Sequence, residues 1–310
     1  MALGTNNVTT TTAAKFIPEI WSDEIVAAYK QNLVAANLFS KMSFKGKKGD
    51  VLHIPKPTRG AASAKSASTQ VTLIAATEDE ILVNINKHYE YSRFIEDIVE
   101  TQALSSLRKF YTDDAGYAIA KQVDTDLIQL GRTAGSGTAY STAATTTNAF
   151  IGSNGTTVYN STSSNAAALG DGGIRRSIQR LDDADVPMSD RLLIVPPTTR
   201  NTLMSIARFT EQAFTGEVGS SNTIRNGLVG DVYGVKVYVS TNADSGAGTS
   251  GTDRICLMAH KDAFVLAEQM GVRSQTQYKQ EWLATLFTTD MLYGVAELRD
   301  SSAVALAVPA

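Results

Sequence analysis

Hydrophobic residues recur at steps of three and four between residues 92 and 130, the spacing of one helix face. No proline lies between Pro57 and Pro187, so nothing there breaks a long helix. With Thr101 as the capping residue, about 30 residues of helix, from about 101 to 130, would span roughly 45 Å. The absence of a sustained heptad repeat favours a structural spine over a coiled coil.

The chain before this helix predicts an arm, a shorter helix and a hairpin. Residues 1–14 are rich in Thr and Asn, and Pro18 opens an amphipathic pattern of about 20 residues. Strand patterns at 51–54, 71–75 and 80–91 enclose a Gly/Ala/Ser/Lys loop at 59–70. The pattern predicts a long two-stranded hairpin, which is marginally stable alone and needs a surface to lie on.

After the spine, residues 133–170 carry no charge and predict a loop with one or two short strands. Helices and strands then alternate, as in an α/β body. The predicted elements are a helix at 174–184, strands at 191–195, 235–239 and 254–258, and a helix from Pro197 to Arg208. Three further strands are predicted at 272–278, 291–298 and 303–308.

Composition excludes several classes of protein. One cysteine cannot close an internal disulfide, and one Cys with three scattered His cannot build a Cys-rich metal site. A net charge of −3 is not that of a dedicated nucleic-acid binder. The N-terminus has no signal-peptide pattern and no apolar run would span a membrane, so we expect synthesis in a cytoplasm and a reduced, buried Cys256.

No pattern predicts a catalytic, cofactor or metal site. Phosphate-binding glycine loops and nucleophile elbows are absent. His53, His88 and His260 show no spacing that pairs them with a nucleophile and an acid, so ordinary structural roles are favoured. The acidic runs at 78–80 and 182–185 lack the frame of a calcium loop.

Charge is strongly segregated on either side of the hairpin. Residues 41–65 carry a net charge of +6 and residues 78–100 a net charge of −5. Both blocks could be solvated, or the basic end of one hairpin could lie on the acidic root of another subunit. Nucleic-acid contact is a third interpretation, but no interleaved aromatic residues support it. The candidate intersubunit residues are Lys45, Lys47, Lys48, Lys56, Arg59, Lys65, Glu78, Asp79, Glu80, Glu96, Asp97 and Glu100.

The order of these parts resembles the major capsid proteins of tailed double-stranded-DNA bacteriophages, which have the Hong Kong 97-type fold. Three phrases typical of podovirus-like coat proteins add to the resemblance: residues 16–22 (FIPEIWS), 232–238 (VYGVKVY) and 292–299 (LYGVAELR). The resemblance implies an α+β fold. Its parts would be an N-terminal arm and helix (1–43), an extended loop (44–91), a peripheral domain with the spine helix (92–173), an axial domain (174–265) and C-terminal strands that rejoin the peripheral domain (266–310).

The resemblance further implies a structural protein, not an enzyme, that self-assembles as hexamers and pentamers into an icosahedral head enclosing double-stranded DNA. Its partners would be a separate scaffolding protein, the portal and a decoration protein, with assembly in the host bacterial cytoplasm. No cofactor and no covalent cross-link are expected. Two alternatives remain: an encapsulin-like compartment shell of the same fold, or a hydrolase that uses a histidine.

Overall fold

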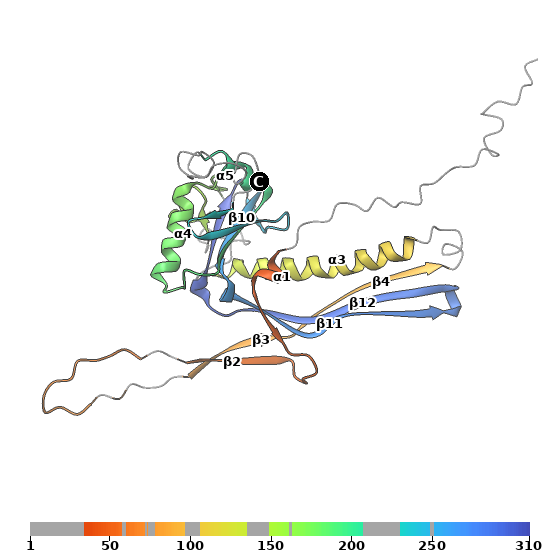
Figure 1. Ribbon diagram of the computed structural model, residues 1–310, viewed down its shortest axis with the longest axis horizontal. Helices are drawn as coiled ribbons and strands as arrows, with labels where there is room; N and C mark the ends of the chain where they lie inside the picture. Colours follow the sequence, from red (N-terminus) through yellow and green to blue (C-terminus); the bar gives the residue numbers. More distant parts are fainter. Residues whose placement is uncertain are drawn as a thin grey trace, which may run out of the picture.

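The computed structural model describes residues 34–57, 60–71, 73, 78–96, 106–134, 149–160, 163–206, 230–248 and 251–310. The arm predicted at 1–14 and most of the helix predicted from Pro18 lie outside these residues. The described chain forms two sheets, a projecting hairpin and one long helix (Figure 1).

A long four-stranded sheet is covered on one face by the predicted spine helix, α3 (Ser106–Gln129) (Figure 1). Its strand order is β1 (Ser40–Ser43), β11 (Phe264–Lys279), β12 (Ala284–Glu297) and β4 (Lys87–Glu96). Ala115, Ile119, Val123 and Leu127 are buried at steps of four residues, so they form the helix face that packs on the sheet. The spine prediction is therefore confirmed over 106–129, while residues 101–105 lie outside the described part.

The helical periodicity predicted that residues 92–96 belong to the helix, but they belong to β4. Ten consecutive residues of β4 pair with β12 in antiparallel register, which overrides a local helical pattern. Ile95 is buried as a strand residue.

The second sheet has seven strands and carries α4 (Asp171–Asp183) and α5 (Pro197–Met204). Its order is β5 (Phe150–Ile151), β13 (Ala303–Val308), β10 (Gly251–His260), β6 (Arg191–Val195), β8 (Val235–Val239) and β7 (Asp231–Val232), with β9 (Ser245–Gly248) beside β10. Every residue of β6 and β13 is buried, as expected for apolar runs in the middle of a sheet. The strands predicted at 191–195, 235–239, 254–258 and 303–308 and the helix predicted at 174–184 are confirmed.

The predicted grouping of the C-terminal strands is wrong in one respect. β11 and β12 lie in the long sheet, but β13 pairs with β10 and β5 in the seven-stranded sheet. The single turn η5 (Asp300–Ser302) redirects the chain between the two sheets. The apolar sequence of β13 has two sheet neighbours there, which buries it completely.

The hairpin is shorter than its predicted range. Its arms are β2 (Val51–Pro57) and β3 (Glu78–Asn84), and the strand predicted at 80–91 is interrupted at Ile85 and Asn86 before β4 begins. The crossing over β12 requires Gly294, since a Cβ there would lie 2.4 Å from the carbonyl oxygen of Asn84. Residues 87–91 therefore belong to the long sheet and not to the hairpin.

Two buried carboxylates of α3 connect the helix to the rest of the chain. Asp124 accepts hydrogen bonds from the backbone N–H groups of Val34 (3.0 Å) and Ala35 (2.6 Å), at the start of α1 (Ala35–Leu38). Its second oxygen accepts one from Asn242 Nδ2 (3.0 Å), in the loop after β8. Asp124 therefore connects three segments that are far apart in the sequence.

Asp126 connects α3 to the long sheet. The Tyr293 hydroxyl in β12 donates to it at 2.6 Å, and Lys87 Nζ at the start of β4 lies 3.1 Å away. Burial and the Asp126 carboxylate both raise the pKa of Tyr293, which keeps the hydroxyl protonated as a donor.

We expect Asp124→Ala to lower the free energy of unfolding by about 3 kcal/mol, because one buried and two partly buried donors lose their acceptor. Asp183→Ala, at an exposed position in the last turn of α4, should change it by less than about 0.5 kcal/mol. Denaturant titration followed by circular dichroism measures both. Equal effects of the two substitutions would contradict the anchoring role of Asp124.

Candidate assembly surfaces

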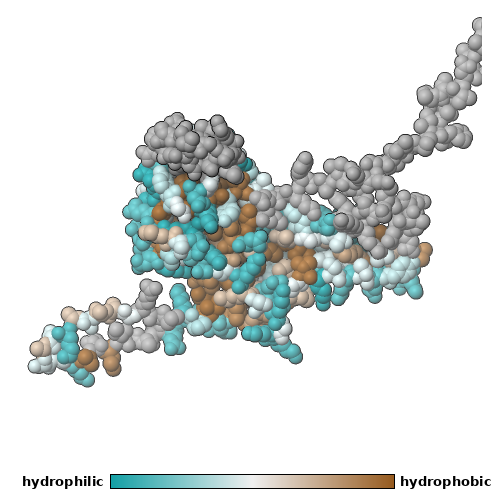
Figure 2. Space-filling view, in the orientation of Figure 1, coloured by the Kyte–Doolittle hydropathy of each residue, from teal (hydrophilic) through white to brown (hydrophobic). Residues whose placement is uncertain are grey.

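The β2–β3 hairpin projects from the body and is covered by the described chain only at its root (Figure 1). At the root, Val83 packs with Val265 and Ala267 in a small buried cluster, flanked by Leu52 and Ile54. Figure 2 shows hydrophobic residues gathered in the middle of the molecule and few on the projecting part. A two-stranded ribbon without a core needs further contacts for stability, so its projecting part is a candidate interface.

Beyond the strands, the described residues of the connecting loop, 60–71 and 73, are all exposed. Val71 is 61% and Leu73 88% exposed. Apolar side chains at such exposure on a projection are typical of a surface that another molecule covers.

Three of the predicted basic residues, Lys45, Lys47 and Lys48, lie in the turn between β1 and β2. We call residues 44–50 the base turn. Lys45 forms an ion pair with Glu268 (3.1 Å), and Lys47 lies over the Phe44 ring. Lys48 is exposed.

The base turn is held firmly to the long sheet. The Gln269 side-chain amide donates to the carbonyl oxygens of Lys47 (3.0 Å) and Gly49 (2.9 Å). The Phe44 N–H donates to the Glu268 carbonyl oxygen at 2.8 Å. The turn therefore presents its lysines in a fixed position.

The remaining charged candidates are distributed over three places. Glu78, Asp79 and Glu80 begin β3, where Asp79 pairs in register with Lys56 and Glu80 lies 2.8 Å from His53. Lys65 is exposed in the connecting loop. Glu96 lies at the end of β4, on the other side of the molecule from the hairpin (Figure 1). Arg59, Asp97 and Glu100 lie outside the described residues.

The sequence suggested that the acidic block at 78–100 forms one surface, but its described residues lie in two separate places. Its first three residues belong to the hairpin, whereas Glu96 belongs to the long sheet. After the break at Ile85 and Asn86 the chain continues in the same direction along β4, which separates the two groups (Figure 1).

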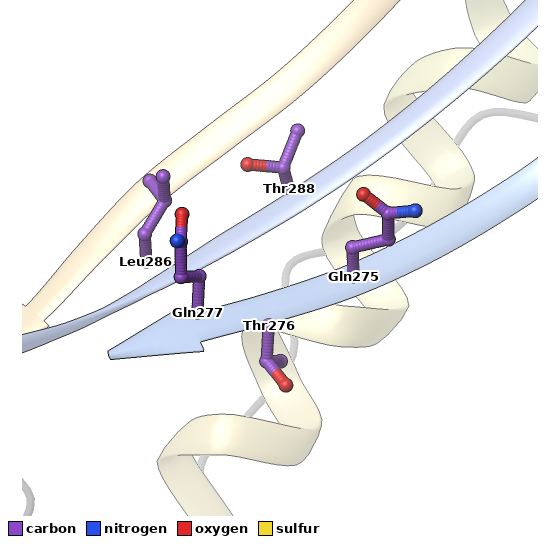
Figure 3. A pocket seen from close by; sticks show the side chains of 5 residues that line it. All are labelled: Gln275, Thr276, Gln277, Leu286 and Thr288. Carbon is purple, nitrogen blue, oxygen red and sulfur yellow. The ribbon is translucent and has the colours of Figure 1, made fainter. Parts of the chain in front are cut away.

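The face of the long sheet opposite α3 carries a shallow depression of about 540 Å³. Gln275, Gln277, Leu286 and Thr288 line it from one side of β11 and β12, while Thr276 points the other way (Figure 3). The lining holds amide and hydroxyl groups but no charge or nucleophile paired with a base. This depression suits contact with another polypeptide better than catalysis.

The three histidines occupy structural positions. His53 contacts Glu80, and His88 lies 3.2 Å from Asp290, which also binds Arg273 through two hydrogen bonds. His260 Nδ1 accepts from the Asp262 N–H. None of these contacts includes a nucleophile.

Cys256 is fully buried, and burial raises the pKa of its thiol to about 12, which keeps it unreactive. Within the described ranges, no three His, Cys, Asp or Glu side chains are grouped so that they could hold a metal ion. In the same part of the chain, no helix is both long and apolar enough to cross a membrane.

A partly buried carboxyl group sits where the two sheets meet. Glu297 ends β12, and its Oε2 accepts from the Thr133 hydroxyl (3.3 Å), which follows the turn η2 (Leu130–Arg132) after the spine helix. Burial, followed by the nearby Asp300 carboxylate, raises the pKa of Glu297 to about 7. The sequence offered no sign of this group, since its hydrogen-bond partner Thr133 lies 164 residues away in the chain.

The geometry defines a class of protein: a structural subunit whose surfaces are arranged for contact with other polypeptides. The model of the phage capsid protein family matches residues 90–299, and the chain belongs to this family. Membership of this family makes the chain a phage capsid protein, a structural subunit of a virion shell.

The fold is also that of solved capsid structures. The chain matches the structure of Mycobacterium phage Che8 with a TM-score of 0.74 at 20% identity, covering 98% of both chains. It matches the capsid of cyanophage P-SCSP1u with a TM-score of 0.73 at 20% identity, covering 99% of this chain and 96% of that one. The cyanophage Pam1 capsid gives 0.73 at 13% identity, covering 99% of both. A search of curated proteins finds no match.

These likenesses confirm the α+β, Hong Kong 97-type fold predicted from the sequence. They favour a phage shell over the encapsulin alternative. They identify a structural protein, in line with the sites described above.

The raised pKa of Glu297 predicts a pH-dependent stability. The folded chain binds this proton more tightly than the unfolded chain, so the contribution is complete below about 4.5 and is lost as pH rises through about 7. We expect the loss to be about 1 to 2 kcal/mol, because partial solvent exposure weakens the effect.

Glu297→Gln should remove this part of the pH dependence, whereas Glu281→Gln, at an exposed turn between β11 and β12, should not. Denaturant midpoints measured from pH 4.5 to 8 give the comparison. A Glu297→Gln profile parallel to that of the unchanged protein would show that the group does not titrate in this range.

Proposed function

We propose that copies of this chain assemble as hexamers and pentamers into an icosahedral phage head that encloses double-stranded DNA. The observation that supports this most directly is the β2–β3 hairpin, which leaves the body and, beyond its root, finds no covering surface in the described part of its own chain. A neighbouring subunit would supply that surface, so that assembly stabilises the hairpin.

In this proposal the chain keeps the division expected from the sequence, with two adjustments. Residues 1–43 form the arm and its helix, 44–91 the extended loop, 92–173 the peripheral part, 174–265 the axial part and 266–310 the returning strands. The first adjustment moves residues 87–91, as part of β4, from the extended loop to the long sheet of the peripheral part. The second moves β13 from the returning strands to the axial sheet.

The proposed partners beyond the chain itself are a scaffolding protein, the portal, a decoration protein and packaged DNA bound without sequence preference. Assembly would take place in the host bacterial cytoplasm. We propose no catalytic role, because the function of a shell subunit is distributed over its interfaces. Neighbouring genes for a portal and a terminase would favour a phage head over a compartment shell.

The proposed function predicts that the purified chain assembles. Expressed with the scaffolding protein encoded beside it, the chain should form closed particles of uniform size, visible by negative-stain electron microscopy. A chain that stays monomeric at every concentration with its scaffolding protein present would contradict the proposal.

Shortening the connecting loop of the hairpin separates folding from assembly. Replacing residues 60–73 by a short Gly/Ser turn should leave the thermal midpoint of the monomer within a few degrees, because the described loop residues are all exposed. Particle yield should fall at least tenfold, because the hairpin no longer reaches its neighbour. Normal particle yield from the shortened chain would show that the loop makes no essential contact.

A further inference from the structure

The charged residues of the hairpin occupy two separate sites that the fold does not explain. The base turn carries Lys47 and Lys48, and neither forms an ion pair with a described residue, whereas Lys45 is neutralised by Glu268. Glu78 and Asp79, at the start of β3, are likewise exposed and without an ion pair in the described structure. Neither site is purely of one sign, because Asp50 follows the two lysines and Lys56 lies opposite Asp79 in the strand register. Each site nevertheless keeps an excess of one sign, since Glu80 adds to the acidic pair, and each would gain from an opposite partner.

The backbone around each pair is ordered by its own hydrogen bonds. The Gln269 amide holds the base turn through two carbonyl oxygens, and the register of β2 with β3 holds the acidic residues. Side chains on a fixed backbone lose less conformational entropy on binding than side chains on a free loop. Both sites are therefore better prepared for a partner than an ordinary cluster of surface charges.

The two sites cannot satisfy each other within one subunit. In the antiparallel register, Glu78 is opposite Pro57 and Asp79 is opposite Lys56, at the far end of β2 from the base turn. Strands rise about 3.3 Å per residue, so roughly 20 Å separate the two sites. This exceeds the Debye length of about 8 Å at physiological salt, so the opposite charges must be brought together by a second molecule.

We propose that the base turn of one subunit, through Lys47 and Lys48, binds the acidic start of β3, Glu78 and Asp79, in the hairpin of a neighbouring copy. This inference rests on the proposed function and names the surface that receives the hairpin. It reverses the polarity expected from the sequence, in which the basic end of the hairpin lay on an acidic root. The excess charges of the two sites are opposite in sign, and repeated contacts of this kind would join many copies.

Charge reversal on either side tests the contact. Lys47→Glu with Lys48→Glu, or Glu78→Lys with Asp79→Lys, should each lower particle yield at least tenfold, while the thermal midpoint of the monomer stays unchanged. The chain that carries all four substitutions should recover to within threefold of the original yield. Lys121→Glu, at an exposed position of α3, is the matched control and should assemble normally.

Mixing the two doubly substituted chains gives a test that does not require closed shells. Each chain offers the site that the other lacks, so sedimentation velocity should detect association in the mixture and little in either chain alone. The association should weaken steeply between 50 and 500 mM salt, a range chosen around the screening length given above.

Several outcomes would overturn the inference. One is that the chain with all four substitutions assembles no better than the doubly substituted chains. Another is that the two doubly substituted chains do not associate when mixed, although the original chain forms particles. Lysine reversal that leaves empty-particle yield unchanged but lowers DNA content would assign the base turn to phosphate binding instead. If the original chain forms no shells but the mixed variants associate, the contact stands and the shell proposal fails.

Discussion

The structure depends on the buried carboxylates of one helix. Asp124 and Asp126 lie two positions apart on α3, so they point to different sides. Asp124 points to the start of α1 and the Asn242 loop, and Asp126 points to Tyr293 and Lys87. A buried carboxylate is tolerated only where donors satisfy it, so the helix can occupy only the position in which both sets are present. The long sheet, the start of the described chain and the loop beside the second sheet are therefore placed relative to one helix.

One helix covers only one face of a sheet, and this has consequences for the subunit's surface. The face of β11 and β12 opposite α3 keeps its Gln, Thr and Leu side chains uncovered (Figure 3). The hairpin crosses β12 at Gly294, and only its root, at Leu52, Ile54 and Val83, still packs on the long sheet within the described chain. An isolated domain would ordinarily cover such surfaces, whereas a shell subunit can leave them for its neighbours.

The sequence predicted those elements whose pattern is local. The spine helix, the buried strand at 191–195 and the last strand at 303–308 each show the periodicity or the apolar run of the element they form. It could not predict which strand pairs with which, because pairing joins residues far apart in the chain. The assignment of 87–96 to β12 and the departure of β13 to the second sheet were missed for this reason, and so was the burial of Glu297. Among the candidate site residues, the types and blocks of charge were visible, but their positions on the hairpin required the register of β2 with β3.

The charge pattern has a physical logic once that register is known. A net charge of −3 over 310 residues puts little long-range repulsion between identical copies. Low net charge alone would also favour unspecific association, so orientation must come from where the charges lie. The base turn carries an excess of positive charge and the start of β3 an excess of negative charge, about 20 Å apart along the strands, a separation that isolates each site from the other within a subunit. Low net charge lets a copy approach its neighbour without strong repulsion. Like charges are kept apart only when the base turn of one copy meets the acidic start of β3 of the other.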